Sequence, residues 1–280
     1  MSVGWGQNCI DGVEVELWGE CYNIENTTFI NLSYQEGSDY PPLYGVIPPE
    51  IGQLVNMTDL YLGGNELTLI PPEIGNLVNL QSLYLYGNQF TSIPSEIGNL
   101  VYLRTLDISY NQITEFPVEL YTLTNLEFLS LFYNQLTGEI PSEIGNLINL
   151  NHLELDHNNL TGEIPPEIGN LTNLNHLGLY VNQLTGQIPS EIYNLTNLVS
   201  LIINNNQLVG VLSSEIENLI NLRYLHLYNN FLYGSIPSEI GNLTDLESIH
   251  LGWNFMNGQV PPEIGNLINL RELILISNSK

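Results

Sequence analysis

The chain has 280 residues, and 30 Asp and Glu against 4 Lys and Arg give it a formal net charge of −26. This charge excludes nucleic acid as a partner, because Lys and Arg are needed to neutralise phosphates, and it disfavours anionic membrane surfaces. No run of about 18 apolar residues occurs, so we expect no membrane-spanning helix and no membrane insertion.

Residues 1–26 precede the first repeat and are predicted to form an N-terminal cap, with the alternation Val13, Val15 and Leu17 indicating a short strand. The end of a repeat array exposes an apolar cross-section that must be covered. We expect Trp5 and Trp18 to cover it rather than to contact a ligand.

Cys9 and Cys21 are the only cysteines, and both lie in the cap. A close pair in a terminal segment predicts a disulfide formed in an oxidising compartment, whereas a metal site would need further ligands, and none lies nearby in the sequence. We therefore expect a secreted or cell-surface protein. The first residues lack the basic and apolar regions of a signal peptide, which we expect to be absent from this sequence.

Residues 27–280 repeat one stretch, whose clearest copy spans residues 150–174. An Asn closes the first part of each copy, first at intervals of 23 residues and then of 24. A fixed period of this length predicts a solenoid, in which each unit buries its apolar face against its neighbours. These ladder asparagines are Asn65, Asn88, Asn111, Asn134, Asn158, Asn182, Asn206, Asn230, Asn254 and Asn278.

Each copy contains an L-x-L segment that alternates apolar and variable residues, as a strand with one buried face does. We expect about eleven such strands, beginning with residues 29–33 and running parallel in one sheet. The Asn after each strand can satisfy backbone groups of adjacent turns. Pro in the following I-P step favours short 3₁₀ turns and little α-helix on the opposite side.

A Glu occupies the same position of every copy, and this stripe is interpreted as a solvated flank. Its members are Glu50, Glu73, Glu96, Glu119, Glu143, Glu167, Glu191, Glu215, Glu239 and Glu263.

The pattern L-x-x-L-x-L-x-x-N-x-L-T-G-x-I-P-x-E-I-G-N-L resembles the leucine-rich repeat proteins. It is similar to the plant-specific subclass found in receptor-kinase ectodomains and polygalacturonase inhibitors, while the nearly identical copies suggest a secreted bacterial relative. The resemblance covers residues 27–280. It implies a horseshoe with one long parallel sheet on its concave face and a partial second sheet near the L-T-G-x-I-P segments.

Several copies depart from this pattern. Glu36–Pro42 is an inserted loop, and the copies LTLIPPEI, FTSIPSEI and ITEFPVEL lack Gly, so the second sheet is in doubt between Leu67 and Phe116. The copy LVGVLSSEIENL lacks Pro. The last strand, Leu270–Ile276, has no C-terminal cap after it, and its uncovered edge predicts self-association.

The variable positions of each strand form three columns on the concave face. These columns are rich in aromatic residues and histidines, which are enriched in binding surfaces. The alternative is that Tyr simply suits strands. The candidate ligand-binding residues are Tyr61, Tyr84, Tyr86, Phe128, Phe132, His152, Glu154, Asp156, His176, Tyr180, Tyr224, His226, Tyr228 and His250.

Imidazoles and carboxylates could together hold a divalent metal ion. His152 and His176 are expected side by side on neighbouring strands, and with Asp156 they are weak metal candidates. His226 and His250 form a second predicted pair. Because alternate residues of one strand lie about 6.6–7 Å apart, wide for a single ion, no metal and no cofactor is predicted.

No catalytic arrangement occurs in the sequence, and an open sheet would not exclude water. The chain is therefore predicted to be a non-enzymatic binding module for a protein, peptide or glycan. The alternatives are a structural or adhesin spacer whose binding is carried elsewhere, and a metal-binding protein that uses the cluster of His152, Glu154, Asp156, His157 and His176.

Overall fold

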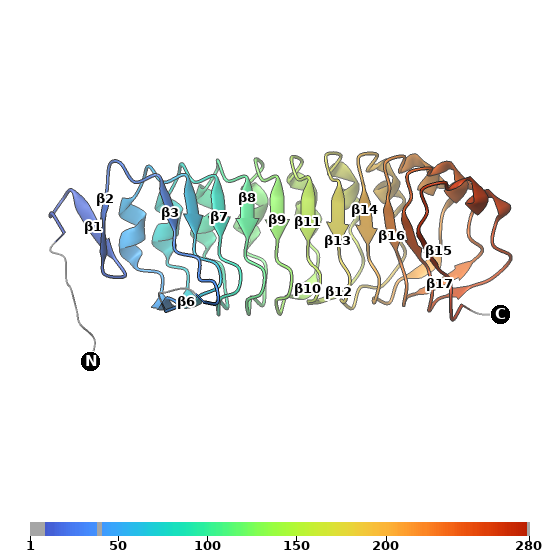
Figure 1. Ribbon diagram of the computed structural model, residues 1–280, viewed down its shortest axis with the longest axis horizontal. Coiled ribbons are helices and arrows are strands. Elements are labelled where there is room, and N and C mark those ends of the chain that lie inside the picture. The colour runs from blue at the N-terminus through green and yellow to red at the C-terminus, as the bar shows by residue number, and fades with distance from the viewer. Residues whose placement is uncertain (1–8, 38–40, 279–280) are drawn as a thin grey trace. The chain divides into compact units, whose positions relative to one another are not determined.

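The computed structural model describes residues 9–37 and 41–278. Two compact units make up the chain: an N-terminal unit, Met1–Phe128, and a C-terminal unit, Leu129–Lys280. In each unit short parallel strands lie side by side, and 3₁₀ helices lie on the opposite side of the core (Figure 1).

A hairpin begins the described part of the N-terminal unit. β1 (Glu14–Leu17) pairs antiparallel with β2 (Glu20–Asn23), and β1 lies against the first 3₁₀ helix. Val15 and Leu17 are buried, whereas Val13 is exposed. The predicted strand is confirmed, while Trp5 lies outside the described residues. The boundary of the cap at residue 26 stays a prediction.

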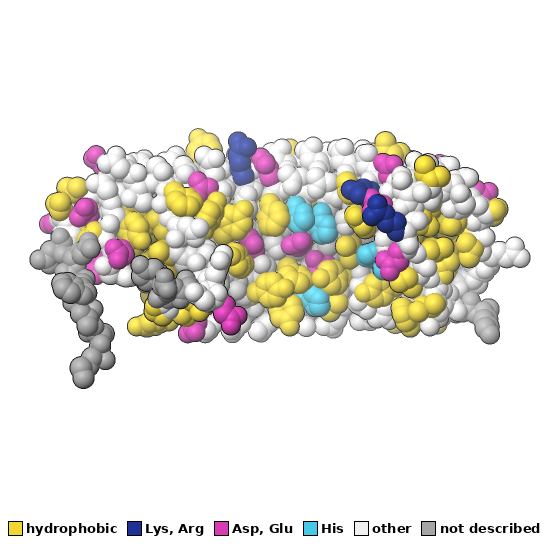
Figure 2. Space-filling view, viewed as in Figure 1, with side chains coloured by type: hydrophobic (Ala, Val, Ile, Leu, Met, Phe, Trp, Pro, Cys, Tyr) yellow, Lys and Arg dark blue, Asp and Glu magenta, His cyan; other side chains and the backbone are white. Residues whose placement is uncertain are grey.

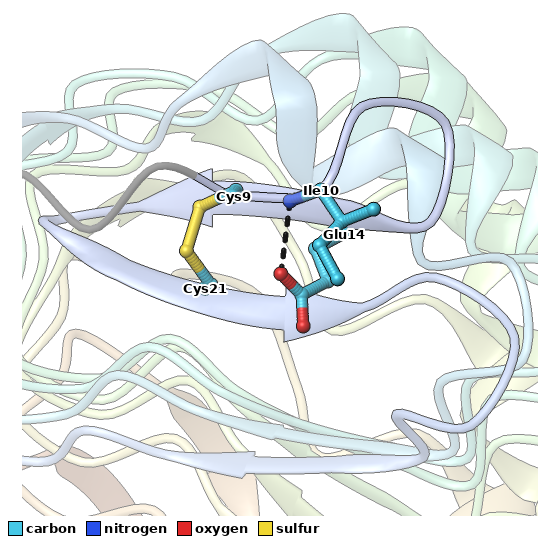
Figure 3. The surroundings of a disulfide bond; sticks show 4 residues. All are labelled: Cys9, Ile10, Glu14 and Cys21. Carbon is cyan, nitrogen blue, oxygen red and sulfur yellow. Dashed lines mark hydrogen bonds between the residues drawn. A yellow bond between two sulfur atoms is a disulfide. The ribbon is translucent and has the colours of Figure 1, made fainter.

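The predicted disulfide joins Cys9 to Cys21 across this hairpin (Figure 3). Beside it, the Ile10 N–H donates a hydrogen bond to the Glu14 carboxylate at 3.0 Å. The disulfide therefore ties the start of the described chain to β2.

The eleven predicted repeat strands are all present. In the N-terminal unit the parallel order is β3 (Phe29–Asn31), β5 (Asp59–Tyr61), β7 (Ser82–Tyr84) and β8 (Thr105–Asp107). The first strand is two residues shorter than predicted. The next strand, β9 (Phe128–Ser130), begins at the last residue of this unit.

In the C-terminal unit six further strands pair in parallel and in sequence order. They are β11 (His152–Glu154), β13 (His176–Gly178), β14 (Ser200–Ile202), β16 (Tyr224–His226), β18 (Ser248–His250) and β20 (Glu272–Ile274). In the last strand Leu273 is 38% exposed, although the equivalent Leu and Ile of earlier repeats are buried. Self-association through Leu270–Ile276 stays a prediction.

The opposite side carries the short 3₁₀ helices that the Pro positions predict, and no α-helix occurs in the described parts of the chain. None of these helices has the length and apolar character that a membrane crossing would require. The stripe Glu lies in the first turn of each helix, away from the strands. The helices are η1 (Pro49–Gln53), η2 (Pro72–Asn76), η3 (Ser95–Asn99), η4 (Val118–Thr122), η5 (Ser142–Asn146), η6 (Pro166–Asn170), η7 (Ser190–Asn194), η8 (Ser214–Asn218), η9 (Ser238–Asn242) and η10 (Pro262–Asn266).

Secondary strands form a further set of small parallel sheets. In the N-terminal unit β4 (Tyr44–Val46) pairs with β6 (Glu66–Leu69). In the C-terminal unit β10 (Thr137–Glu139) pairs with β12 (Asn159–Thr161), and β15 (Val209–Val211), β17 (Phe231–Gly234) and β19 (Phe255–Met256) form a three-stranded sheet.

The second sheet includes the first of the three copies, starting at Leu67, for which it was in doubt. The LTLIPPEI copy forms β6, because the pairing register shifts between Gly45 and Val46 and passes over Thr68. The Thr68 hydroxyl donates to the Gly45 carbonyl at 2.9 Å and stabilises this irregularity. The FTSIPSEI and ITEFPVEL copies, for which the second sheet was in doubt, form no strand at these positions. In the copy that lacks Pro, Ser213 caps η8 by accepting a hydrogen bond from the Glu215 N–H at 3.1 Å.

The ladder asparagines hold the repeats in register. Asn158 is 7% exposed, and its side-chain NH₂ donates to the carbonyls of Leu131, Leu155 and Asp156 at 3.0–3.1 Å. Its side-chain oxygen accepts from the Leu136 N–H at 2.9 Å. One amide thus satisfies buried backbone groups of two consecutive repeats, as the sequence predicted.

Replacing one ladder asparagine should destabilise the fold far more than replacing an exposed one. We expect Asn158→Ala to lower the free energy of unfolding by about 2–4 kcal/mol, because it leaves several buried backbone groups unpaired. Asn173→Ala is the matched control, since Asn173 is exposed and donates one bond, to Ile148 O; its cost should stay below about 1 kcal/mol. Urea unfolding measures both. Equal losses would contradict a structural role for the ladder.

Candidate functional site

The three predicted columns lie on the solvent-facing side of the main strands, here called the strand face. On it histidine side chains lie beside acidic and hydrophobic ones (Figure 2). Every candidate residue of these columns is half-buried, except Asp156, which is 2% exposed. None points into the leucine core, so the sequence assigned the direction of these side chains correctly.

In the N-terminal unit the candidate aromatic residues contact one another. The Tyr61 and Tyr84 rings lie 4.7 Å apart, edge to face, and Phe29 extends this row at 5.4 Å from Tyr61. Tyr86 covers Gly63, where a side chain would overlap its ring. Burial raises the pKa of the Tyr84 hydroxyl, and nearby Tyr61 and Asp107 add to the shift. This row is an apolar surface with hydroxyl groups at its edge.

In the C-terminal unit two imidazoles and one carboxylate converge. His152 and His176 are direct neighbours in the parallel register, and their rings stack 4.3 Å apart. Nε2 of His152 lies 2.9 Å from Oε1 of Glu154, and Nε2 of His176 lies 3.9 Å from the same oxygen. The other oxygen of Glu154 accepts a hydrogen bond from the Ser130 hydroxyl at 2.8 Å.

Burial and neighbouring groups determine the protonation states of His176 and Glu154. Burial lowers the pKa of His176 to about 4, and the neighbouring His152 acts in the same direction, while Glu154 partly opposes it. The hydrogen bond with His152 lowers the pKa of Glu154 against the opposing effect of burial. At neutral pH His176 is therefore uncharged with a free lone pair, and Glu154 is a carboxylate.

The structure corrects the place of Asp156, which does not join this cluster. Its carboxylate turns towards the next repeat and accepts a hydrogen bond from the Tyr180 N–H at 2.7 Å. Gly178 makes this possible, because any side chain there would overlap the carboxylate. Burial raises the pKa of Asp156 to about 8, although the Tyr180 N–H opposes the shift. The groups close enough to share one metal ion are therefore His152, Glu154 and His176, without Asp156.

Next to Asp156 lies an aromatic cluster, formed by Phe132, Tyr133, His157 and Tyr180. The His157 ring lies 5.4 Å from Phe132, 5.4 Å from Tyr133 and 4.9 Å from Tyr180, mostly edge to face. The hydrogen bond from the Tyr180 N–H to buried Asp156 holds the backbone beneath these rings. The cluster is thus a preformed apolar patch with polar groups at its rim.

Sequence reasoning missed a fourth column, the residue before each ladder Asn. These residues adopt left-handed backbone conformations with φ near +50°, and their side chains are exposed or half-buried. We call them the rim column. Gly64 and Gly87 occupy the same place in the first copies, and this Gly and Asn preference was the available signal. The non-glycine members are Tyr110, Tyr133, His157, Val181, Asn205, Asn229, Trp253 and Ser277.

His226 and His250 form a second stacked pair, with rings 4.1 Å apart. The Ser248 hydroxyl oxygen lies 3.0 Å and 3.1 Å from their Nε2 atoms. Of these two imidazoles Glu272 pairs with His250, at 3.0 Å, and it also accepts a hydrogen bond from Ser248 at 3.4 Å. Burial lowers the pKa of His226 to about 4, with His250 acting in the same direction. Here a neutral hydroxyl, and not a carboxylate, joins the two imidazoles.

Tyrosine and arginine side chains surround this second pair. Tyr228 lies 6.0 Å from the His250 ring, and the Arg223 guanidinium lies over the Tyr224 ring at 5.7 Å. Arg223 also forms an ion pair with Glu247. The remaining candidate, Phe128, is half-buried on β9.

The repeats match two family descriptions. "Leucine-rich repeat region" matches residues 72–159, and "Leucine Rich Repeat" matches residues 56–77, 149–171, 173–195, 197–219 and 221–243. The chain therefore belongs to the leucine-rich repeat proteins, and its fold is a leucine-rich repeat solenoid with 3₁₀ turns. No curated protein sequence matches it significantly.

Solved structures of both plant and bacterial proteins are similar to the chain. The Arabidopsis receptor kinase HAESA, in complex with the peptide hormone IDA and a co-receptor, is 37% identical with a TM-score of 0.81, over 85% of this chain and 40% of that chain. A leucine-rich repeat protein of Leptospira interrogans is 42% identical with a TM-score of 0.74, over 85% and 59%. A plant ice-binding protein is 30% identical with a TM-score of 0.72, over 86% and 82%. The chain spans 46%, 32% and 40% of three plant receptor structures that it matches.

The protonation of Asp156 makes a testable contribution to stability. Its folded pKa of about 8 exceeds the unfolded value of about 3.9, so between these values the folded state holds a proton that the unfolded state releases. The contribution of Asp156 to stability should therefore fall as pH rises through this window, by up to about 1.4 kcal/mol per pH unit. Asp156→Asn should remove this fall.

Urea unfolding at pH 5 and pH 8 measures the effect as the difference between variant and wild type. Asp245→Asn is the matched control, since it removes an exposed carboxylate of the same unit. Parallel pH profiles for wild type and Asp156→Asn would contradict the assignment.

Proposed function

We propose that the chain is a non-enzymatic, secreted or cell-surface binding module that recognises a peptide or a peptide segment of a protein. The aromatic cluster of the C-terminal unit is its main contact, and the observation that carries the proposal is the geometry of this cluster. Its four rings touch one another on an open surface, and Tyr133 is 53% exposed. Rings that are already ordered lose little entropy on binding a ligand.

The surroundings of the cluster suit a peptide. Buried Asp156 holds the backbone at Tyr180, so the patch is rigid, while Glu154 and the two histidines offer polar partners for a peptide backbone. Interfaces of this kind have an apolar centre and a polar rim. The complex of HAESA with a peptide hormone supports a peptide as the ligand class for a related fold. The disulfide between Cys9 and Cys21 supports an oxidising location.

Selection of ligands from a displayed peptide library tests the proposal. We expect the enriched peptides to bind wild type and to lose at least about tenfold in affinity for Phe132→Ala/Tyr180→Ala, because aromatic residues at an interface centre contribute most of the binding energy. The control is Phe231→Ala/Tyr233→Ala, which removes two exposed aromatics from β17 in the same unit. Its affinity should match wild type.

Circular dichroism confirms that both double variants fold. Peptides that bind the Phe132→Ala/Tyr180→Ala variant as well as wild type would refute the aromatic cluster as the contact. If no peptide is enriched, a glycan array probed with the same three proteins distinguishes a glycan ligand from a spacer that binds nothing.

A further inference from the structure

The second feature of the strand face is chemically distinct from the aromatic cluster. One ligand atom from each of His152, Glu154 and His176 lies within 4.8 Å of the others. Two imidazole nitrogens and one carboxylate oxygen are a donor set that Zn²⁺ takes in proteins, with water completing a tetrahedron. We propose that His152, Glu154 and His176 bind one divalent transition-metal ion, with Zn²⁺ as the best fit.

Backbone geometry places the three donors without any rearrangement of the strands. His152 and Glu154 lie two residues apart on β11 and so share one face, and His176 lies directly opposite His152 on β13. Buried Leu153 and Leu177 fix both strands against the core. Only small side-chain rotations are needed, because both Nε2 atoms already approach Oε1 of Glu154, at 2.9 Å and 3.9 Å.

A neighbouring residue orients the carboxylate. The Ser130 hydroxyl donates to Oε2 of Glu154 at 2.8 Å, which leaves Oε1 directed at the two imidazoles. Such hydrogen bonds to the ligands of a metal fix their orientation and strengthen the site. The site is also accessible, since the three side chains retain 22–29% exposure, enough for an ion and its water to enter.

The second histidine pair provides a comparison within the same molecule. His226 and His250 stack as closely as the first pair, but the Ser248 hydroxyl lies between their Nε2 atoms. Of the two imidazoles Glu272 pairs with His250; it also accepts a hydrogen bond from the Ser248 hydroxyl at 3.4 Å, and its side chain is 56% exposed. Two imidazoles without a shared carboxylate make a weaker site, so we expect one tightly bound ion per chain.

The test uses the full chain with its disulfide intact, without a histidine tag, stripped with chelator and dialysed. Titration with ZnCl₂ in a calorimeter should give one equivalent of binding, and Co²⁺ in the same site should show the visible absorption of four-coordinate cobalt. Glu154→Gln and His176→Ala should each weaken Zn²⁺ binding at least about tenfold. His226→Ala, the matched control, should keep the affinity and stoichiometry of wild type.

A measurement on the wild type keeps the test independent of how the variants fold. Zn²⁺ should shift the imidazole NMR signals of two of the five histidines, and assignment should identify them as His152 and His176. Zn²⁺ binding that is unchanged in both Glu154→Gln and His176→Ala would overturn the proposal, because the ion would then lie elsewhere on the acidic surface. The absence of any imidazole shift would overturn it as well. No peptide takes part, so failure here leaves the proposed peptide binding untouched.

Discussion

The hydrogen bonds of the buried ladder asparagines are the constraint on which the strand face depends. Each amide joins backbone groups of consecutive repeats, as Asn158 does between Leu131 and Leu155. Because this fixes the register, residues at equivalent positions of neighbouring repeats lie directly side by side. His152 meets His176, and His226 meets His250, for the same reason. The residues at equivalent solvent-facing positions therefore form columns, and their side-chain types can vary without disturbing the core.

The main sheet, the 3₁₀ helices and the pairing of histidines could be predicted, since they follow from backbone periodicity. The disulfide could be predicted because Cys9 and Cys21 form a close pair in the cap. What could not be predicted depends on one side chain in the next repeat. Asp156 turns away from His152 because Gly178 leaves room for its carboxylate beside the Tyr180 N–H. No pattern within one repeat contains that information.

Two other features also depend on a neighbouring repeat or on a weak sequence signal. β6 forms without the expected Gly because its partner strand tolerates a register shift at Gly45. The left-handed rim column shows in the sequence only as an occasional Gly or Asn before the ladder position, as at Gly64 and Asn205. The periodicity within one repeat predicts the strands and 3₁₀ helices well. The direction of a side chain that contacts the next repeat can be predicted only from the residues of that next repeat.

The two histidine pairs show how little must change for the chemistry of a repeat surface to differ. Both pairs stack, and in each the pKa of one imidazole, His176 or His226, falls to about 4. Those two imidazoles are neutral at neutral pH, so they add no positive charge to the face. The two pairs differ in the group that contacts their imidazole nitrogens: Glu154 supplies a charged oxygen, whereas Ser248 supplies a neutral one. Charge and donor type therefore vary while the backbone stays constant.

The left-handed rim column also shows that the chain is less stable than its fold allows. A non-glycine residue in this conformation costs about 1–2 kcal/mol, and Val181, with its branched Cβ, is among the most strained. Gly or Asn in that column would release the strain, as earlier and later repeats do. The chain instead keeps Tyr133, His157 and Trp253 there. Gly or Asn in this column would make the fold more stable, but it would remove the aromatic side chains that the chain displays there.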